Sequence, residues 1–268
     1  MSLMLLAAYL ATGAVAGFFA GLLGVGGGVV VVPMLALLFA GQGFPENEIL
    51  HLALGTSMAT ILFTAASSLR AHHAHRAVLW PTVRRLTPGI LLGTLCGAYL
   101  ATFVSSRLLA LIFAAFMLFV ASQMISQRRP RADRSLPGAL GLSLAGGVIG
   151  AFSSLVAIGG GALTVPFLIW CGVRPQQAIG TSAAVGLPIA IGGTCGYVWH
   201  GWGHAGLPPG SLGFVYLPAL AVILVASVLV APLGARLTHQ LPVRLLRGIF
   251  AGLLLLLSAK MLWNLFAP

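Results

Sequence analysis

Two glycine-rich segments at matched distances along the chain are the first candidates for chemistry. They comprise Gly26, Gly27 and Gly28, followed by Pro33, and Gly159, Gly160 and Gly161, followed by Pro166. Three consecutive glycines make a poor helix interior, and they allow positive φ angles. Their backbone N–H groups, beside the start of a helix, can hold an anion. We interpret the two segments as halves of a midplane site, with close helix packing as the alternative.

Two Gly-Thr-Ser triplets form a second matched pair. They are Gly55-Thr56-Ser57 and Gly180-Thr181-Ser182. Each follows a predicted turn by seven to ten residues, so we expect it one to two turns inside a helix. The four hydroxyl groups can donate to an oxyanion, although a buried hydroxyl commonly bonds a carbonyl of its own helix instead. The duplication favours the functional interpretation.

Few residues of the chain could act as acids, bases or metal ligands. The acidic residues are Glu46, Glu48 and Asp133, and all three fall in predicted loops, which argues against a carboxylate proton relay within the membrane. We expect the histidines at positions 72, 73 and 75 to contact lipid headgroups rather than a metal. The sequence predicts no metal site, no cofactor and no catalytic group. A site of backbone N–H and hydroxyl groups suits a small anion.

The composition indicates the environment that must position these residues. Of 268 residues, 59% are hydrophobic and 6% are charged, and the mean hydropathy is +1.05, which excludes a soluble protein. The net charge of +11 lies in short patches between apolar runs, as in membrane anchors rather than in a nucleic-acid-binding surface. Most of the runs are long enough to span a bilayer, whereas those beginning at 29 and 162 are too short. The runs cover about residues 3–24, 29–40, 49–69, 86–104, 107–126, 136–157, 162–172, 177–199, 212–235 and 244–266.

The chain repeats itself, which predicts two homologous halves. The glycine segments match at an offset of 133 residues, and so do Gly13 with Gly146 and Gly17 with Gly150, a small-residue face that we interpret as packing. Pro81, Gly97 and Arg107 recur at an offset of 137. The predicted repeats are residues 1–127 and 135–268, joined by a basic cytoplasmic linker at 128–134. A long repeat in a membrane chain is typical of transporters, although channels and receptors can also be duplicated.

Charge separates parallel from inverted repeats. If each glycine segment is the tip of a helical hairpin, each half contains one hairpin and three crossings, and the second half is inverted. With both termini outside, twelve Lys and Arg residues face the cytoplasm and two, Arg107 and Lys260, lie outside. If each half instead makes four plain crossings, with the N-terminus inside, nine Lys and Arg residues face the cytoplasm and five lie outside. Because cytoplasmic loops carry an excess of cations, we predict the inverted arrangement, with the loops at 70–85 and 236–244 both cytoplasmic.

Together, these motifs resemble the sulfite exporter TauE/SafE family, the TSUP permeases. The resemblance is carried by Gly24-Val-Gly-Gly-Gly-Val-Val-Val-Val-Pro33, by its echo from Ala157 to Pro166, and by the two Gly-Thr-Ser triplets, and it covers essentially the whole chain. It implies a secondary carrier of small sulfur-containing anions such as sulfite, sulfonates, sulfoacetate or thiosulfate. Export is what the family leads us to expect.

The sequence therefore predicts an all-α polytopic membrane protein of two inverted-topology repeats, each a Gly-tipped helical hairpin plus three transmembrane helices. We expect it in a bacterial-type inner membrane, in contact with the lipid bilayer and not with nucleic acid, and a homo-oligomer remains open. The expected activity is alternating access around a midplane anion site. An anion channel using the same site is the first alternative, and a membrane enzyme is the second.

Overall fold

The structure is a computed structural model that describes residues 2–23, 27–126, 135–204, 206–238 and 243–266. Its elements in the first half are α1 (Leu3–Leu23), α2 (Gly28–Gly41), α3 (Ile49–Ala74), α4 (Trp80–Thr102) and α5 (Ser106–Ser126). Those in the second half are α6 (Ala139–Leu155), α7 (Gly161–Trp170), α8 (Pro175–Gly201), β1 (Ser211–Leu212), β2 (Val215–Tyr216), α9 (Leu217–Thr238) and α10 (Val243–Phe266). The predicted linker at 128–134 lies outside the described residues.

The predicted fold class is confirmed, because the chain is an all-α polytopic membrane protein. Helices satisfy their own backbone hydrogen bonds, which is what the bilayer interior demands. Among the described residues, five helices are long and apolar enough to cross a membrane: α1, α3, α5, α8 and α10. Their outward faces carry large apolar side chains, whose exposure is unfavourable in water but not in lipid.

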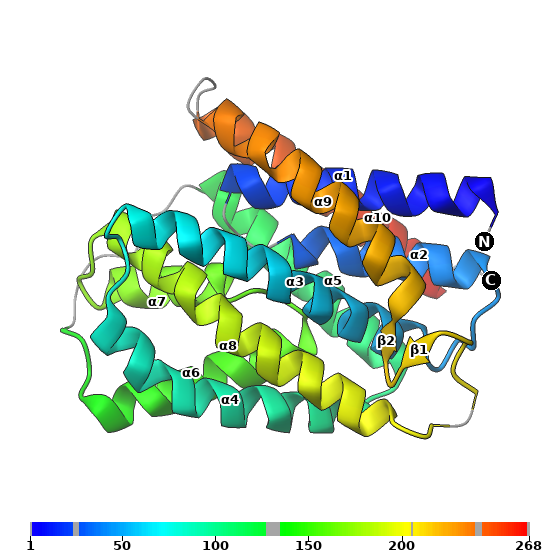
Figure 1. The fold of residues 1–268 in the computed structure, drawn as a ribbon, viewed down its shortest axis with the longest axis horizontal. Helices are drawn as coiled ribbons and strands as arrows, with labels where there is room; N and C mark the ends of the chain where they lie inside the picture. The colour runs from blue at the N-terminus through cyan, green and yellow to red at the C-terminus, as the bar shows by residue number, and fades with distance from the viewer. Residues whose placement is uncertain (1, 24–26, 127–134, 205, 239–242, 267–268) are drawn as a thin grey trace.

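The helices α2 and α7 are short, and each forms a hairpin with the helix before it. They have 14 and 10 residues, so they extend only about 21 and 15 Å, which is too short to cross a hydrocarbon core. In Figure 1, α1 begins and α2 ends at the side of the bundle where the N-terminus lies, and α6 begins and α7 ends at the opposite side. The two tips therefore lie inside the bundle.

The bundle has two ends of different character (Figure 1). The connections at residues 75–79 and 171–174 lie at one end, here called the basic end. The connections at residues 42–48, 103–105 and 202–216 lie at the other, here called the terminus end, because the N-terminus and the end of α10 are also there. None of the three connections at the terminus end contains lysine or arginine in its sequence.

The small-residue faces of α1 and α6 are packing surfaces, as predicted. A Cβ built on Gly13 would collide with the Ile223 carbonyl of α9, and one built on Gly146 would collide with the Leu86 carbonyl of α4. Each glycine thus lets its helix approach a helix of the other half. The partners Leu86 and Ile223 are themselves 137 residues apart, so the two contacts recur at the offsets seen in the sequence.

The predicted basic loop at 70–85 is wrong in its extent. The helix α3 continues to Ala74 and α4 already begins at Trp80, so only residues 75–79 connect them. Pro81 stands in the first turn of α4, where a missing N–H costs nothing. Arg84 and Arg85 are exposed on that helix, because long basic side chains can keep their charge in water from a helical backbone. Likewise α9 continues to Thr238, and residues 239–242 lie outside the described part.

Candidate functional site

The two glycine tips have the same backbone conformation. Gly27 is the residue before α2 with φ of 70°, and Gly160 is the residue before α7 with φ of 71°. These left-handed angles are costly for any residue with a Cβ, which explains why glycine stands at both positions. Neither helix start is capped by a side chain. Of the other predicted tip residues, Gly28 and Gly161 are the first residues of the two helices, and Gly26 lies outside the described residues.

The tips of the two hairpins touch. A Cβ built on Gly28 would overlap the carbonyl oxygen of Ala157, in the turn between α6 and α7. Gly159 of the same turn packs against α8, where its carbonyl oxygen would lie 3.1 Å from a Cβ on Gly186. Ala157 and Ile158 are fully buried. The structure therefore brings the two predicted glycine segments together, in the interior and between the halves.

Each Gly-Thr-Ser triplet lies inside a helix, as predicted, and its glycine admits a segment of the other half. Gly55 is in the second turn of α3, where a Cβ would collide with the Phe214 carbonyl. Gly180 is in the second turn of α8, where a Cβ would lie 2.5 Å from the Ala77 carbonyl. Ala77 and Phe214 are again 137 residues apart. Only glycine leaves room for these close approaches.

The two threonines have backbone partners that the sequence did not predict. The Tyr216 amide donates to Thr56 Oγ1 over 2.9 Å, and the Leu79 amide donates to Thr181 Oγ1 over 3.0 Å. These amides immediately precede α9 and α4, whose first N–H groups have no acceptor within the helix. Each threonine oxygen thus holds the start of a helix in the opposite half, and only its hydroxyl hydrogen is left for a ligand.

The two serines of the triplets are buried without a partner. Ser57 is 0% and Ser182 is 2% exposed, and neither hydroxyl oxygen has a hydrogen-bond partner among the described residues. The Ser57 oxygen would lie 3.1 Å from a Cβ on Gly28, so it faces the first tip. The Ser182 carbonyl would lie 3.6 Å from a Cβ on Gly160, which places this residue at the second tip. A buried unsatisfied hydroxyl is costly, and a ligand would relieve that cost.

Three further hydroxyl groups around the second tip were missed by sequence reasoning. Ser153, Ser154 and Thr164 are all 0% exposed and also lack a partner among the described residues. The Thr164 oxygen would lie 3.6 Å from a Cβ on Gly160. At the repeat offset of 133 the first half has Ala20, Gly21 and Val31, so a comparison of the two halves could have found this excess of hydroxyls.

In the part of the chain that the structure describes, the helices that form the tips carry neutral groups. The helices α1, α2, α6, α7 and α8 contain no Asp, Glu, Lys or Arg, and α3 contains only Arg70, near its end. The positive contribution must come from the starts of α2 and α7, whose N-terminal N–H groups carry partial positive charge. This combination can bind an anion through hydrogen bonds, but it offers no general base and no charged counter-ion.

The described histidines lie towards the two ends of the bundle. His73 accepts a hydrogen bond of 3.3 Å from the Trp80 indole at the basic end. At the terminus end, His204 pairs with Glu48 at 3.0 Å beside a cavity of about 360 Å³ that also includes His51 and His200. In the part of the chain that the structure describes, no three His, Cys, Asp or Glu side chains are grouped so that they could hold a metal ion.

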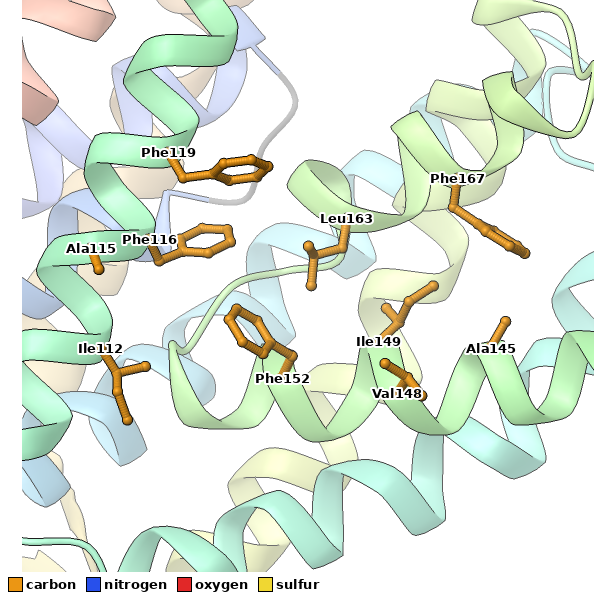
Figure 2. Close-up of a pocket in the computed structure, with 10 residues that line it drawn as sticks. All are labelled: Ile112, Ala115, Phe116, Phe119, Ala145, Val148, Ile149, Phe152, Leu163 and Phe167. Carbon is orange, nitrogen blue, oxygen red and sulfur yellow. The ribbon is translucent and has the colours of Figure 1, made fainter. Parts of the chain in front are cut away.

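A larger groove of about 820 Å³ lies between α5, α6 and α7, as Figure 2 shows. Its lining is apolar and offers no side-chain hydrogen-bond donor to an anion. Figure 2 also shows the hairpin of α6 and α7, with Phe152 and Leu163 on either side of its turn. The lining residues are Ile112, Ala115, Phe116, Phe119, Ala145, Val148, Ile149, Phe152, Leu163 and Phe167.

Comparison with known proteins connects this architecture to membrane transport. The family model described as sulfite exporter TauE/SafE matches residues 9–261. A probable membrane transporter protein of Haemophilus influenzae is 38% identical over 254 residues, which are 94% of this chain and 96% of the relative. Probable membrane transporter proteins of Methanocaldococcus jannaschii and Bacillus subtilis are 25% and 27% identical, covering 97% and 90% of this chain and 96% of each relative. No solved structure matches the chain.

Proposed function

This chain belongs to the sulfite exporter TauE/SafE family, and we propose that it is a secondary transporter of small sulfur-containing anions, working in the direction of export. The names of its family and relatives indicate a membrane transporter rather than an enzyme. The substrates in question are sulfite, sulfonates, sulfoacetate and thiosulfate. Because expelling a negative charge from a cell gains about 2.3 kcal/mol per 100 mV, the membrane potential favours export.

One observation carries the proposal most directly: Ser57 and Ser182 are buried, matched and unbonded among the described residues, and they lie at the two touching glycine tips. In this proposal the anion binds between the tips. The Ser57 and Ser182 hydroxyls and the N–H groups at the start of α2 donate to it. At the start of α7 the Gly160 and Gly161 amides already donate to the carbonyl oxygens of Ile158 and Gly159 over 2.8 Å, so this helix contributes mainly through its dipole. Gly27 and Gly160 keep the tips free of side chains. Thr56 and Thr181 act mainly as braces and contribute their hydroxyl hydrogens.

We propose further that residues 1–127 and 135–268 are inverted repeats, and that both termini lie outside the inner membrane. The matched contacts of Gly13 with Ile223 and of Gly146 with Leu86 support a two-fold relation. The hairpins enter the bundle from opposite ends (Figure 1), as inversion requires. The described arginines at the basic end, including Arg76 and Arg174, support a cytoplasmic location for that end.

An asymmetry between the halves supports alternating access. The helix α10 packs against α2, whereas the equivalent pair in the other half, α5 and α7, is separated by the groove of Figure 2. Because the two repeats are homologous, their two different arrangements suggest the two conformations that each repeat adopts in turn during the transport cycle. In the opposite state, we expect α5 to close on α7 and α10 to leave α2, which moves the access path from one side of the tips to the other.

Counterflow in proteoliposomes tests this function. Vesicles containing purified protein and unlabelled sulfite are diluted into labelled sulfite, and a carrier then accumulates label transiently, with a rate that saturates. Protein carrying both Ser57→Ala and Ser182→Ala is the matched control, and we expect at least about tenfold less uptake at low substrate. Uptake that rises linearly without saturation would identify the channel alternative, and no movement of any of the four sulfur anions would refute the proposed function.

A further inference from the structure

The helices α1, α2, α6, α7 and α8, whose described residues form the tips, contain no Asp, Glu, Lys or Arg. In α3, Arg70 lies 13 residues beyond Ser57, about 20 Å along the helix. Arg174 precedes Ser182 by eight residues, about 12 Å along the helix, and it is exposed at the basic end. The ring of His51 lies between two carbonyl oxygens, with Nε2 2.9 Å from that of Ala101 and Nδ1 3.2 Å from that of Asn47, so either neutral tautomer donates its N–H to the backbone.

The donors that remain are neutral hydroxyl and N–H groups. Ser57, Ser182, Ser153, Ser154 and Thr164 supply the buried hydroxyls that have no partner among the described residues. Neutral donors can replace the hydration of a singly charged oxyanion, whose charge is spread over its oxygens. They cannot neutralise charge as an arginine would.

The desolvation of an ion depends steeply on its charge. In the Born description, the cost of moving an ion from water into a medium of low dielectric rises with the square of the charge, so a doubly charged anion costs about four times as much as a singly charged one of the same size. The stabilisation from hydrogen bonds between the ion and the site rises less steeply with the charge than this desolvation cost does. The Ala157 carbonyl at the contact between the tips further disfavours negative charge, because its oxygen is the negative end of the dipole.

We infer that this site selects singly charged sulfur oxyanions, namely hydrogen sulfite and organic sulfonates with no second acid group, over doubly charged sulfite, thiosulfate, sulfate and sulfoacetate. The inference rests on the proposed function and narrows its substrate class. Sulfite would then be carried as hydrogen sulfite, with the proton bound to the anion. No protein carboxylate would be needed to move that proton, in keeping with the absence of acidic residues from the helices around the site.

Competition with labelled methanesulfonate, using wild-type protein, tests this selectivity. We expect unlabelled methanesulfonate to compete at least about a hundredfold better than sulfate or thiosulfate. Between about pH 6 and pH 9 the apparent affinity for methanesulfonate should stay constant. That for total sulfite should fall by about tenfold per pH unit once the doubly charged form predominates, because only hydrogen sulfite binds.

Three results would overturn the inference in distinguishable ways. Sulfate or thiosulfate competing as well as methanesulfonate would show that charge is not selected, while the transport of sulfur anions would stand. A pH dependence shared by sulfite and methanesulfonate would assign the titration to the protein and not to the ligand. Binding of none of these anions would refute the proposed function together with this inference.

Discussion

The Thr56 hydroxyl oxygen accepts a hydrogen bond of 2.9 Å from the backbone amide of Tyr216, 160 residues further along the chain. Thr181 and Leu79 repeat the arrangement at 3.0 Å with the halves exchanged. The three residues of each Gly-Thr-Ser triplet therefore have different roles. Its glycine makes room for a segment of the opposite half, its threonine fixes that segment, and its serine is left for the interior.

The brace predicts an effect on stability for threonine variants. Thr56→Val and Thr181→Val keep the shape of the side chain but remove the acceptor, which leaves an amide at a helix start without its partner. We expect each variant to lose about 1 to 3 kcal/mol of stability, measured as a lower apparent Tm in detergent. Thr56→Ser and Thr181→Ser retain the oxygen and should stay close to the parent. Valine variants as stable as the serine variants would argue against the brace.

The effect of a methyl group at the glycine tips on anion binding can be distinguished from the effect of backbone strain on stability. Gly27→Ala and Gly160→Ala place a methyl group at the tips, and each should weaken anion binding by about tenfold or more in calorimetry. Gly43→Ala controls for the left-handed backbone alone, because Gly43 has φ of 72° and open space around it, whereas a Cβ on Gly27 would lie 3.1 Å from the Ala16 carbonyl oxygen. It should cost a similar 1 to 2 kcal/mol or so of stability and leave affinity unchanged. Equal affinity in all three variants would make the tips packing devices only.

The packing face provides a second contrast. Gly13→Ala would drive a methyl group into the Ile223 carbonyl, so α1 could not keep its distance from α9. We expect poor expression or a lower Tm, with the affinity of the surviving folded protein close to that of the parent. A Gly13→Ala protein of normal stability would mean that the two helices can separate without loss.

The proposed orientation can be read from cysteine labelling in intact cells. In a background without Cys96, Cys171 and Cys195, Trp202→Cys at the terminus end should react with a membrane-impermeant maleimide. His75→Cys at the basic end should react only after the membrane is opened. Both positions are exposed, so burial does not confound the comparison. Reaction of both from outside is incompatible with the inverted-repeat arrangement, and the reverse pattern is incompatible with the proposed orientation.

The sequence was sufficient for the fold class and for the place of the triplets within helices, because hydropathy and glycine spacing report directly on both. It did not reveal the roles of Thr56 and Thr181. The position of a residue in a helix predicts its depth in the membrane but not which segment packs against it. The partners of these threonines lie in the segments at 77–79 and 214–216, which have no periodic hydrophobic pattern that would predict their place. Thr164 could not be predicted for a related reason, because its counterpart Val31 is apolar and a repeat points only to residues that match between the halves.

Calorimetric titration of methanesulfonate tests most directly whether Ser57 and Ser182 bind the anion between the tips. Because neither hydroxyl has a partner among the described residues, Ser57→Ala and Ser182→Ala should leave Tm unchanged or higher. Ser258→Ala, which removes a buried hydroxyl bonded to the Ala114 carbonyl, is the control and should keep full affinity. We predict at least about tenfold weaker binding for each site variant and no measurable binding for the double variant. A double variant that binds methanesulfonate as tightly as the parent would show that these serines do not bind the anion.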